Sequence, residues 1–198
     1  MEWISQWNQD PQLLNRAFAL GQKALALDDS LPHAHELLAL IYLWRDKQHE
    51  QALAAVKRSV AHAPNWFSGY VVMGMILNTM GRPQETIRMQ EQVMRLSPQS
   101  VPYLMPLGGA YRMTRRYEEA ITVLKRAITL APNNLGAHLN LTATYSESGH
   151  EEEARAEVAE VLRLSPQFSL EAWGQMLPYK DPAEAERVLT ALRKAGLK

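Results

Sequence analysis

Residues 107–132 read LGGAYRMTRRYEEAITVLKRAITLAP, and the pattern of this stretch returns along the chain. Residues 141–166 repeat it at an offset of 34 residues, with leucine, tyrosine, alanine and proline again at the first, fifth, fourteenth and last positions. The same interval separates four prolines, Pro64, Pro98, Pro132 and Pro166. A fixed period of this length indicates an array of equivalent structural units that stack on one another.

Each unit is predicted to consist of two antiparallel helices. Apolar residues recur at helical spacing on both sides of a short turn, and the proline ends the second helix because it lacks an N–H group and has a fixed φ. A lone helix pair cannot bury its apolar face, so each pair needs its neighbours. We therefore expect an all-α fold with helices over these ranges: 11–27, 33–45, 49–62, 67–80, 83–96, 102–114, 117–130, 135–148 and 151–164.

The packing positions of these units resemble those of the tetratricopeptide repeat family. Small residues such as Gly108 and Ala120 stand where the two helices approach closely, and large residues such as Leu107, Tyr111 and Leu124 fill the layer between units. The resemblance extends over nearly the whole chain. It implies a right-handed α-solenoid of antiparallel helix hairpins.

Some positions depart from the family pattern. Leu77 replaces the usual tyrosine, Thr86 the usual alanine and Gln90 the usual large apolar residue. These departures bear on local packing and leave the predicted fold unchanged. One unit also carries an extra residue between Tyr42 and Ala52, which predicts a longer turn in that hairpin.

Two prolines fall within the predicted helix 102–114. Pro102 can lie at its N-terminus. Pro106 fits only if the helix kinks or begins late, because a proline in a helix interior costs about 3 kcal/mol. A kink or a late start would widen the groove beside Gly108 and Gly109.

The chain is predicted to be one domain over residues 1–198, with a different structure at its C-terminal end. Its expected parts are a partial first repeat (1–31), four repeats (32–65, 66–99, 100–133 and 134–167) and a C-terminal cap (168–198). The cap holds a short helix near 170–177 and a second helix from Pro182 to Ala195, with Asp181 as N-cap and Gly196 at the C-terminal end. The second helix is amphipathic, so we expect it to shield the last repeat.

The tail carries a second resemblance. Residues 164–173, 178–182 and 192–197 are similar to the close of tetratricopeptide regions at the C-terminus of some bacterial class III adenylate or guanylate cyclases. These residues include no catalytic ones. The resemblance implies that the chain is the regulatory or interaction part of a larger cyclase-like signalling protein.

The N-terminal residues allow two interpretations. Trp3, Ile4 and Trp7 form an apolar stripe at helical spacing. The stripe could be a truncated first helix that packs on helix 11–27. It could also be an exposed aromatic edge that self-associates or contacts another domain.

Composition excludes several classes of function. Twenty-one basic and 21 acidic residues cancel, so the chain has no net field to attract nucleic acid. It contains no cysteine, which removes disulfides and thiolate chemistry. The longest apolar run, 37–44, is too short to insert across a membrane, and no targeting signal is visible, so we expect a cytoplasmic protein.

The concave groove is the expected functional surface, because the fold itself has no chemistry. It is predicted to be largely apolar, and seven of the nine methionines fall within residues 73–113, which suits a surface that accepts varied apolar segments. Arg112 and Asn140 alone are too few polar groups for a carboxylate clamp of the kind some family members use. The residues assigned to the groove are Leu40, Leu43, Trp44, Val71, Met75, Met105, Arg112, Leu139, Asn140, Leu170 and Trp173.

The sequence offers no constellation of catalytic residues. It has no nucleophile elbow, no glycine-rich phosphate loop and no paired metal ligands, so we expect no enzymatic activity, no cofactor and no metal. Two functions remain. The first is a protein-interaction scaffold that binds an apolar or amphipathic protein or peptide segment in the groove. The alternative is a self-assembling array that forms homo-oligomers.

Overall fold

The computed structural model describes residues 11–96 and 104–198. Within these ranges all regular structure is helical, and the helix bounds match the sequence-based prediction to within two residues. Trp3, Ile4, Trp7, Pro98 and Pro102 lie outside the described residues. The helices are α2 (Pro11–Leu27), α3 (Pro32–Trp44), α4 (His49–His62), α5 (Phe67–Thr79), α6 (Pro83–Leu96), α7 (Leu104–Met113), α8 (Tyr117–Leu130), α9 (Leu135–Ser148), α10 (Glu151–Leu164), α11 (Leu170–Met176) and α12 (Pro182–Ala195).

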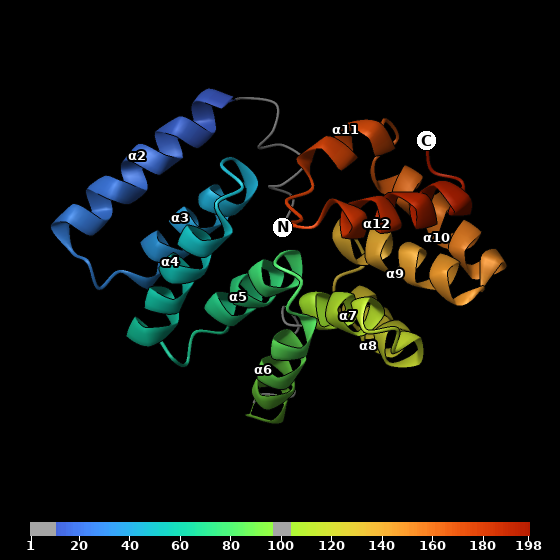
Figure 1. Cartoon of the computed structure of the whole chain (residues 1–198), viewed down its shortest axis with the longest axis horizontal. Helices are drawn as coiled ribbons and strands as arrows, with labels where there is room; N and C mark the ends of the chain where they lie inside the picture. The colour runs from blue at the N-terminus through green and yellow to red at the C-terminus, as the bar shows by residue number, and fades with distance from the viewer. Residues whose placement is uncertain (1–10, 97–103) are drawn as a thin grey trace.

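The helices form an α-solenoid of hairpins. Helices α3 and α4, α5 and α6, α7 and α8, and α9 and α10 pack as pairs, and the second helix of each pair also packs on the first helix of the next. The first helices α3, α5, α7 and α9 contact one another in turn, whereas no comparable contacts join α4, α6, α8 and α10 in the described ranges. Helices on the inside of a curved array come closest together, so α3, α5, α7 and α9 form its inner row (Figure 1).

The turns inside the hairpins share one conformation. Lys47, Gly81, Arg115 and Gly149 lie 34 residues apart, and all four adopt a positive φ. After Gly81, Arg115 and Gly149, the amide of the next residue donates a hydrogen bond to the carbonyl five residues earlier, as Arg116 does to Tyr111. In the first hairpin the amide of Gln48 reaches six residues back, to the carbonyl of Tyr42. This confirms the predicted extra residue in that turn.

The polar departures from the family pattern are accommodated inside the hairpin of α5 and α6. Thr86 and Gln90 are completely buried. The hydroxyl of Thr86 donates to the carbonyl of Gly74 at 3.2 Å, and the side-chain amide of Gln90 donates to the carbonyl of Tyr70 at 2.7 Å. A buried donor with a partner costs little, so both donors fit within the helix pair, although Oε1 of the buried Gln90 has no hydrogen-bond partner among the described residues.

Helix α7 is described from Leu104, and residues 102 and 103 of the predicted helix lie outside the described residues. Pro106 is the third residue of the described helix. Its carbonyl accepts a hydrogen bond of 2.8 Å from the side-chain amide of Asn78 on α5. The kink or late start expected from the sequence stays a prediction, because the residues before Leu104 lie outside the described ranges.

Close approach of α7 and α8 depends on Gly108. A Cβ atom there would lie 2.5 Å from Cγ of Leu124, which is fully buried. We expect Gly108→Ala to lower the free energy of unfolding by about 1–3 kcal/mol, the usual cost of overpacking. Urea unfolding followed by circular dichroism measures it.

Gly109 provides a matched control for Gly108. The nearest side-chain atom to a Cβ at Gly109 is Nδ2 of Asn78, at 3.4 Å. Gly109→Ala should leave stability unchanged or raise it by up to about 1 kcal/mol, because alanine favours the helix. Equal losses in the two variants would contradict the packing described for α7 and α8.

The C-terminal segment ends in two helices, of which the second is capped as the sequence predicts. The side chain of Asp181 accepts a hydrogen bond from the amide of Ala183, and Gly196 adopts the left-handed conformation after α12. Helix α12 packs mainly on α9, and less on α11 and α10. Within the described residues, no helix is both long and apolar enough to cross a membrane.

Candidate protein-binding groove

The structure divides the predicted groove residues into two groups. Half-buried side chains, which reach the surface, are Leu40, Trp44, Met75, Met105, Asn140 and Trp173. Buried side chains are Leu43, Val71, Arg112, Leu139 and Leu170. The second group therefore contributes packing, and its members do not form an open surface.

Two of the buried residues lie in the core of the hairpins. Leu43 shares a buried cluster with Ala52 on α4, and Val71 shares one with Val93 on α6 and Leu104 on α7. Both were assigned to the groove because helical spacing alone places a face only approximately. The extra residue in the first turn adds to the ambiguity for Leu43, since it shifts the repeat register there.

The other buried residues are covered by the C-terminal segment. Leu139 on α9 and Leu170 on α11 share one buried cluster with Val188 and Leu192 of α12. Residues 137–139 and 141–146 of α9 are all buried, because α7, α8, α10 and α12 surround this helix. The chain's own helix thus occupies the inner side of α9, and α7 is buried from residue 106 to 112. The open part of the inner row therefore lies over α3 and α5, where Leu40, Trp44 and Met75 are half-buried.

The inner row is almost uncharged. Among the residues within the bounds of α3, α5, α7 and α9, the Asp, Glu, Lys and Arg residues are Glu36, Arg112 and Glu147. Helix α10 of the outer layer carries five glutamates and two arginines within its bounds. The concave side therefore offers uncharged side chains, such as those of Trp44 and Met75, between polar outer helices.

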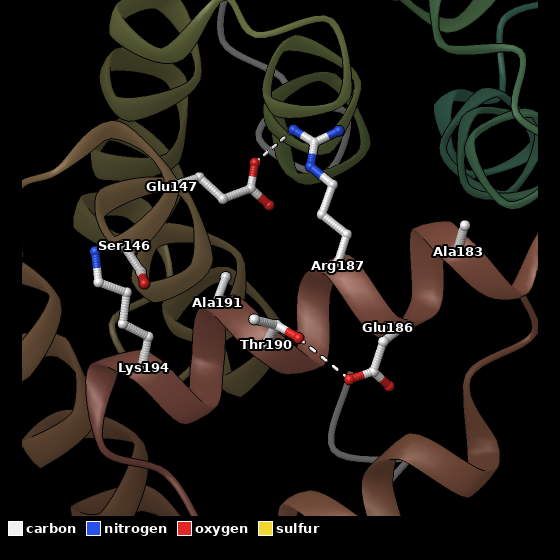
Figure 2. Close-up of a pocket in the computed structure, with 8 residues that line it drawn as sticks. All are labelled: Ser146, Glu147, Ala183, Glu186, Arg187, Thr190, Ala191 and Lys194. Atoms are coloured by element: carbon white, nitrogen blue, oxygen red, sulfur yellow. Dashed lines mark hydrogen bonds and ion pairs between the residues drawn. The ribbon is translucent and has the colours of Figure 1, made fainter.

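An ion-pair cluster links the inner row to α12. The Glu147 carboxylate lies 2.5 Å from Nη1 of Arg112 and 2.5 Å from Nη2 of Arg187. Arg112 and Glu147 are 1% and 8% exposed, and Figure 2 shows Glu147 of α9 facing Arg187 of α12. Burial acts to lower the pKa of Arg187, but the charge and hydrogen bond of Glu147 outweigh it and raise that pKa. Glu147 thus forms ion pairs with two guanidinium groups, that of Arg112 on α7 and that of Arg187 on α12.

A hollow of about 470 Å³ adjoins this cluster. Ser146 and Glu147 of α9 line one side and residues of α12 line the other (Figure 2). The α12 residues are Ala183, Glu186, Arg187, Thr190, Ala191 and Lys194. The hollow follows the edge of α12, so the contact between α9 and α12 is incompletely sealed on this side.

The linker between α11 and α12 contacts the first two hairpins. The amide of Lys180 donates to the carbonyl of Thr79 at 2.8 Å, and Nε2 of the buried His49 donates to the carbonyl of Pro178 at 2.5 Å. The ammonium group of Lys180 lies 2.5 Å from the Glu50 carboxylate and lowers its pKa. Residues that are far apart in sequence therefore meet where the linker crosses the turns after α3 and α5 (Figure 1).

Comparison with known proteins agrees with this architecture. Residues 111–174 match the family model described as tetratricopeptide repeat. This stretch is thus similar to tetratricopeptide repeats. No curated protein sequence matches the chain.

Several solved structures share the tetratricopeptide fold of the chain. A thermophilic protein with these repeats from Thermus thermophilus is 23% identical, with 91% of each chain covered and a TM-score of 0.69. PilW, a type IV pilus biogenesis factor, is 18% identical, with 98% of this chain and 86% of that chain covered and a TM-score of 0.69. YrrB, described as having an unusual peptide-binding site, is 20% identical over 88% of this chain and 90% of that one, with a TM-score of 0.54.

Sequence reasoning missed the roles of Glu147 and Arg187. A signal was present for Glu147: Arg112 and Glu147 carry opposite charge, lie 35 residues apart and are the charged residues of two successive first helices. Residues one repeat apart on successive first helices face each other, so the pair could have been inferred. The sequence held no comparable signal for Arg187, because its place depends on how α12 folds back.

Tyr111 gives the fold a measurable dependence on pH. Burial and a hydrogen bond of 2.7 Å from its hydroxyl to Glu91 raise the pKa of Tyr111 to about 12, from 10.0. Between pH 10.0 and about 12, the folded state thus retains the phenol proton of Tyr111, whereas the unfolded chain loses it. The free energy of unfolding should therefore fall as the pH rises through this range. Urea unfolding across this range should show a weaker fall in Tyr111→Phe. Parallel curves for the two proteins would contradict the shift.

Proposed function

We propose that this chain is a non-catalytic protein-interaction scaffold that binds an apolar or amphipathic protein segment on its concave side. The near absence of charge from the inner row carries the proposal. Such a surface gains free energy when apolar area is covered, and it does not attract nucleic acid. The packing of the chain's own α12 on α9 supports it, because one amphipathic helix already lies against this face.

The test uses Met75, a half-buried residue at the open part of the inner row. A photo-crosslinking residue at this position of the full chain would label a partner in extracts of the source cells, and mass spectrometry would identify it. The purified partner should then bind Met75→Glu at least about tenfold more weakly than the unmodified chain. Val71 is unsuitable because its substitution would disturb the core.

Leu130 on α8 supplies the control. It is 49% exposed on the outer layer, so Leu130→Glu introduces the same charge away from the groove. Both variants should keep the helical content of the unmodified chain by circular dichroism. If the two variants bind the purified partner equally well, the inner row is not the binding surface.

Exposed leucines on α2 favour a second candidate function, self-assembly. Leu13, Leu20 and Leu27 recur every seven residues and are 53%, 58% and 81% exposed. A leucine every seven residues is typical of a helix that pairs with another helix. Light scattering over a dilution series should show a mass that falls with concentration, and Leu20→Glu should be monomeric throughout. A monomeric mass for the unmodified chain at every concentration would exclude this candidate.

The link to a larger cyclase-like signalling protein stays a prediction. It rests on the resemblance of residues 164–173, 178–182 and 192–197 alone. The reading frame around this segment tests it, since an upstream cyclase catalytic domain would support the link. A frame that encodes no such domain would remove it.

A further inference from the structure

Helix α12 departs from the pattern by which the other helices stack. Helix α11 begins 35 residues after the start of α9, where the first helix of another hairpin would begin, but it ends at Met176. Helix α12 then folds back onto α9, the first helix of the preceding hairpin. In the earlier hairpins of the described ranges, no second helix makes more than a weak contact with the first helix of the preceding hairpin. Helix α12 therefore lies on the concave face of the last repeat.

Several contacts hold α12 in this place, including an ion pair of 3.3 Å between Lys194 and Glu151 and the burial of Leu197 just after the helix. Two of them bear on the choice of partner. The first is an apolar stripe of α12, formed by Val188, Ala191, Leu192 and Ala195, which are all buried. Three members of this stripe share a cluster with Leu139 and Ala143 of α9. The second feature is the ion pair of Arg187 with Glu147, at the edge of the stripe.

The linker stays attached independently of α12. Its contacts with Thr79, His49 and Glu50 involve residues up to Lys180, whereas the helix begins at Pro182. Helix α12 can therefore leave α9 by a change of backbone direction near Asp181 while the linker remains bound. Its release also withdraws Leu197 from the cluster with Leu139 and breaks the hydrogen bond from the amide of Leu170 to the carbonyl of Lys198. A helix tethered in this way returns readily, because its local concentration at the face is high.

We propose that α12 is a releasable occupant of the concave face, and that the partner segment is an amphipathic helix built in the same way. Its pattern is a basic residue followed by apolar residues one, four, five and eight positions later, as in Arg187 and the apolar stripe of α12. The basic residue pairs with Glu147, and the apolar residues cover Leu139 and Ala143. This inference rests on the proposed function, since it names the class of segment that the face binds.

The probe for the test is a fluorescent synthetic peptide of residues 181–198. The full chain should bind it weakly, because the tethered α12 competes for the same surface. Arg187→Glu in the full chain removes the ion pair with Glu147 and weakens this competitor. We expect the variant to bind the peptide at least about tenfold more tightly than the unmodified chain, as measured by fluorescence anisotropy.

Two controls test the specificity of this gain. Arg193 is 59% exposed on the same helix, so Arg193→Glu makes the same charge change away from Glu147 and should bind the peptide as the unmodified chain does. A peptide that itself carries Arg187→Glu should not bind either protein. A gain of binding with Arg193→Glu equal to that with Arg187→Glu would show that net charge, and not the ion pair with Glu147, controls the site.

Hydrogen exchange of residues 188–195 reports whether α12 leaves α9. Fast exchange in Arg187→Glu without a gain in peptide binding would overturn the proposal. If exchange stays slow in Arg187→Glu, Leu192→Asp disrupts the apolar stripe directly, and peptide binding is then measured with that variant. Exchange that occurs only with global unfolding in both variants would show α12 to be a fixed part of the core, which also overturns it. No other protein is involved, so this result is independent of the experiment at Met75.

Discussion

Glu147→Ala is expected to lower the free energy of unfolding by about 3–5 kcal/mol. The substitution removes the carboxylate that lies 2.5 Å from both Arg112 and Arg187. Arg112 would then hold an unpaired charge at a site where 1% of its side chain is exposed, and burial of an unpaired charge is costly. Urea unfolding at neutral pH measures the loss.

Glu151→Ala is the matched control for Glu147→Ala. Glu151 pairs with Arg155 and with Lys194 of α12, but the three side chains are 53%, 66% and 56% exposed. Removal of a surface pair changes stability by at most about 1 kcal/mol, because water screens both charges. The double variant Arg112→Met with Glu147→Leu should recover much of the lost stability, since it leaves no buried charge behind. Similar losses for Glu147→Ala and Glu151→Ala would contradict the burial of the cluster.

Leu124→Ala is expected to lower the free energy of unfolding by about 2–5 kcal/mol. Leu124 is fully buried between α7 and α8, and it shares a cluster with Leu107, Tyr111 and Leu141. Truncation would remove apolar contacts with three helices and leave a cavity that the array cannot easily close. Leu130→Ala, at an exposed position of the same helix, should cost far less.

A double variant at Gly108 and Leu124 tests whether these two residues are in direct contact. The side chain of Leu124 is what a Cβ at Gly108 would strike. In the Leu124→Ala background, Gly108→Ala should therefore cost much less than in the unmodified chain, and the two changes should not add. Additive losses would show that Gly108 is required for a reason other than its contact with Leu124.

The repeat pattern by itself determined the fold of this protein. The period of 34 residues, with small residues at positions such as Gly108 and prolines at the ends of units, restricts each segment to a helix of set length. Because stacked units contact only their neighbours, local pattern and global fold agree, and the helix bounds followed to within two residues. The longer turn after Tyr42 was also readable, since a hairpin turn is set by local sequence.

The faces of the inner helices were only partly predictable. Half-buried positions such as Met75 and Met105 follow from helical spacing, but Leu43 and Val71 lie in the core. A helix turns by 100° per residue, so an error of one residue in the predicted register moves a side chain from the groove face to the core face. The helices of the inner row were therefore foreseen, whereas five of the residues assigned to the groove are buried, and the groove itself stays a prediction.

Only the tertiary structure decided where the C-terminal helix lies. The sequence fixes α12 as an amphipathic helix through Asp181, Pro182 and Gly196, yet an amphipathic pattern requires only that the apolar side be covered. Helix α12 could satisfy that pattern by packing on α10, as another repeat would, or equally by folding back onto α9. The choice comes from contacts distant in sequence, such as Arg187 with Glu147 and Lys180 with Thr79, which exist only once the array has brought these residues together. The sequence shows what α12 must bury, and the assembled array determines against which surface it does so.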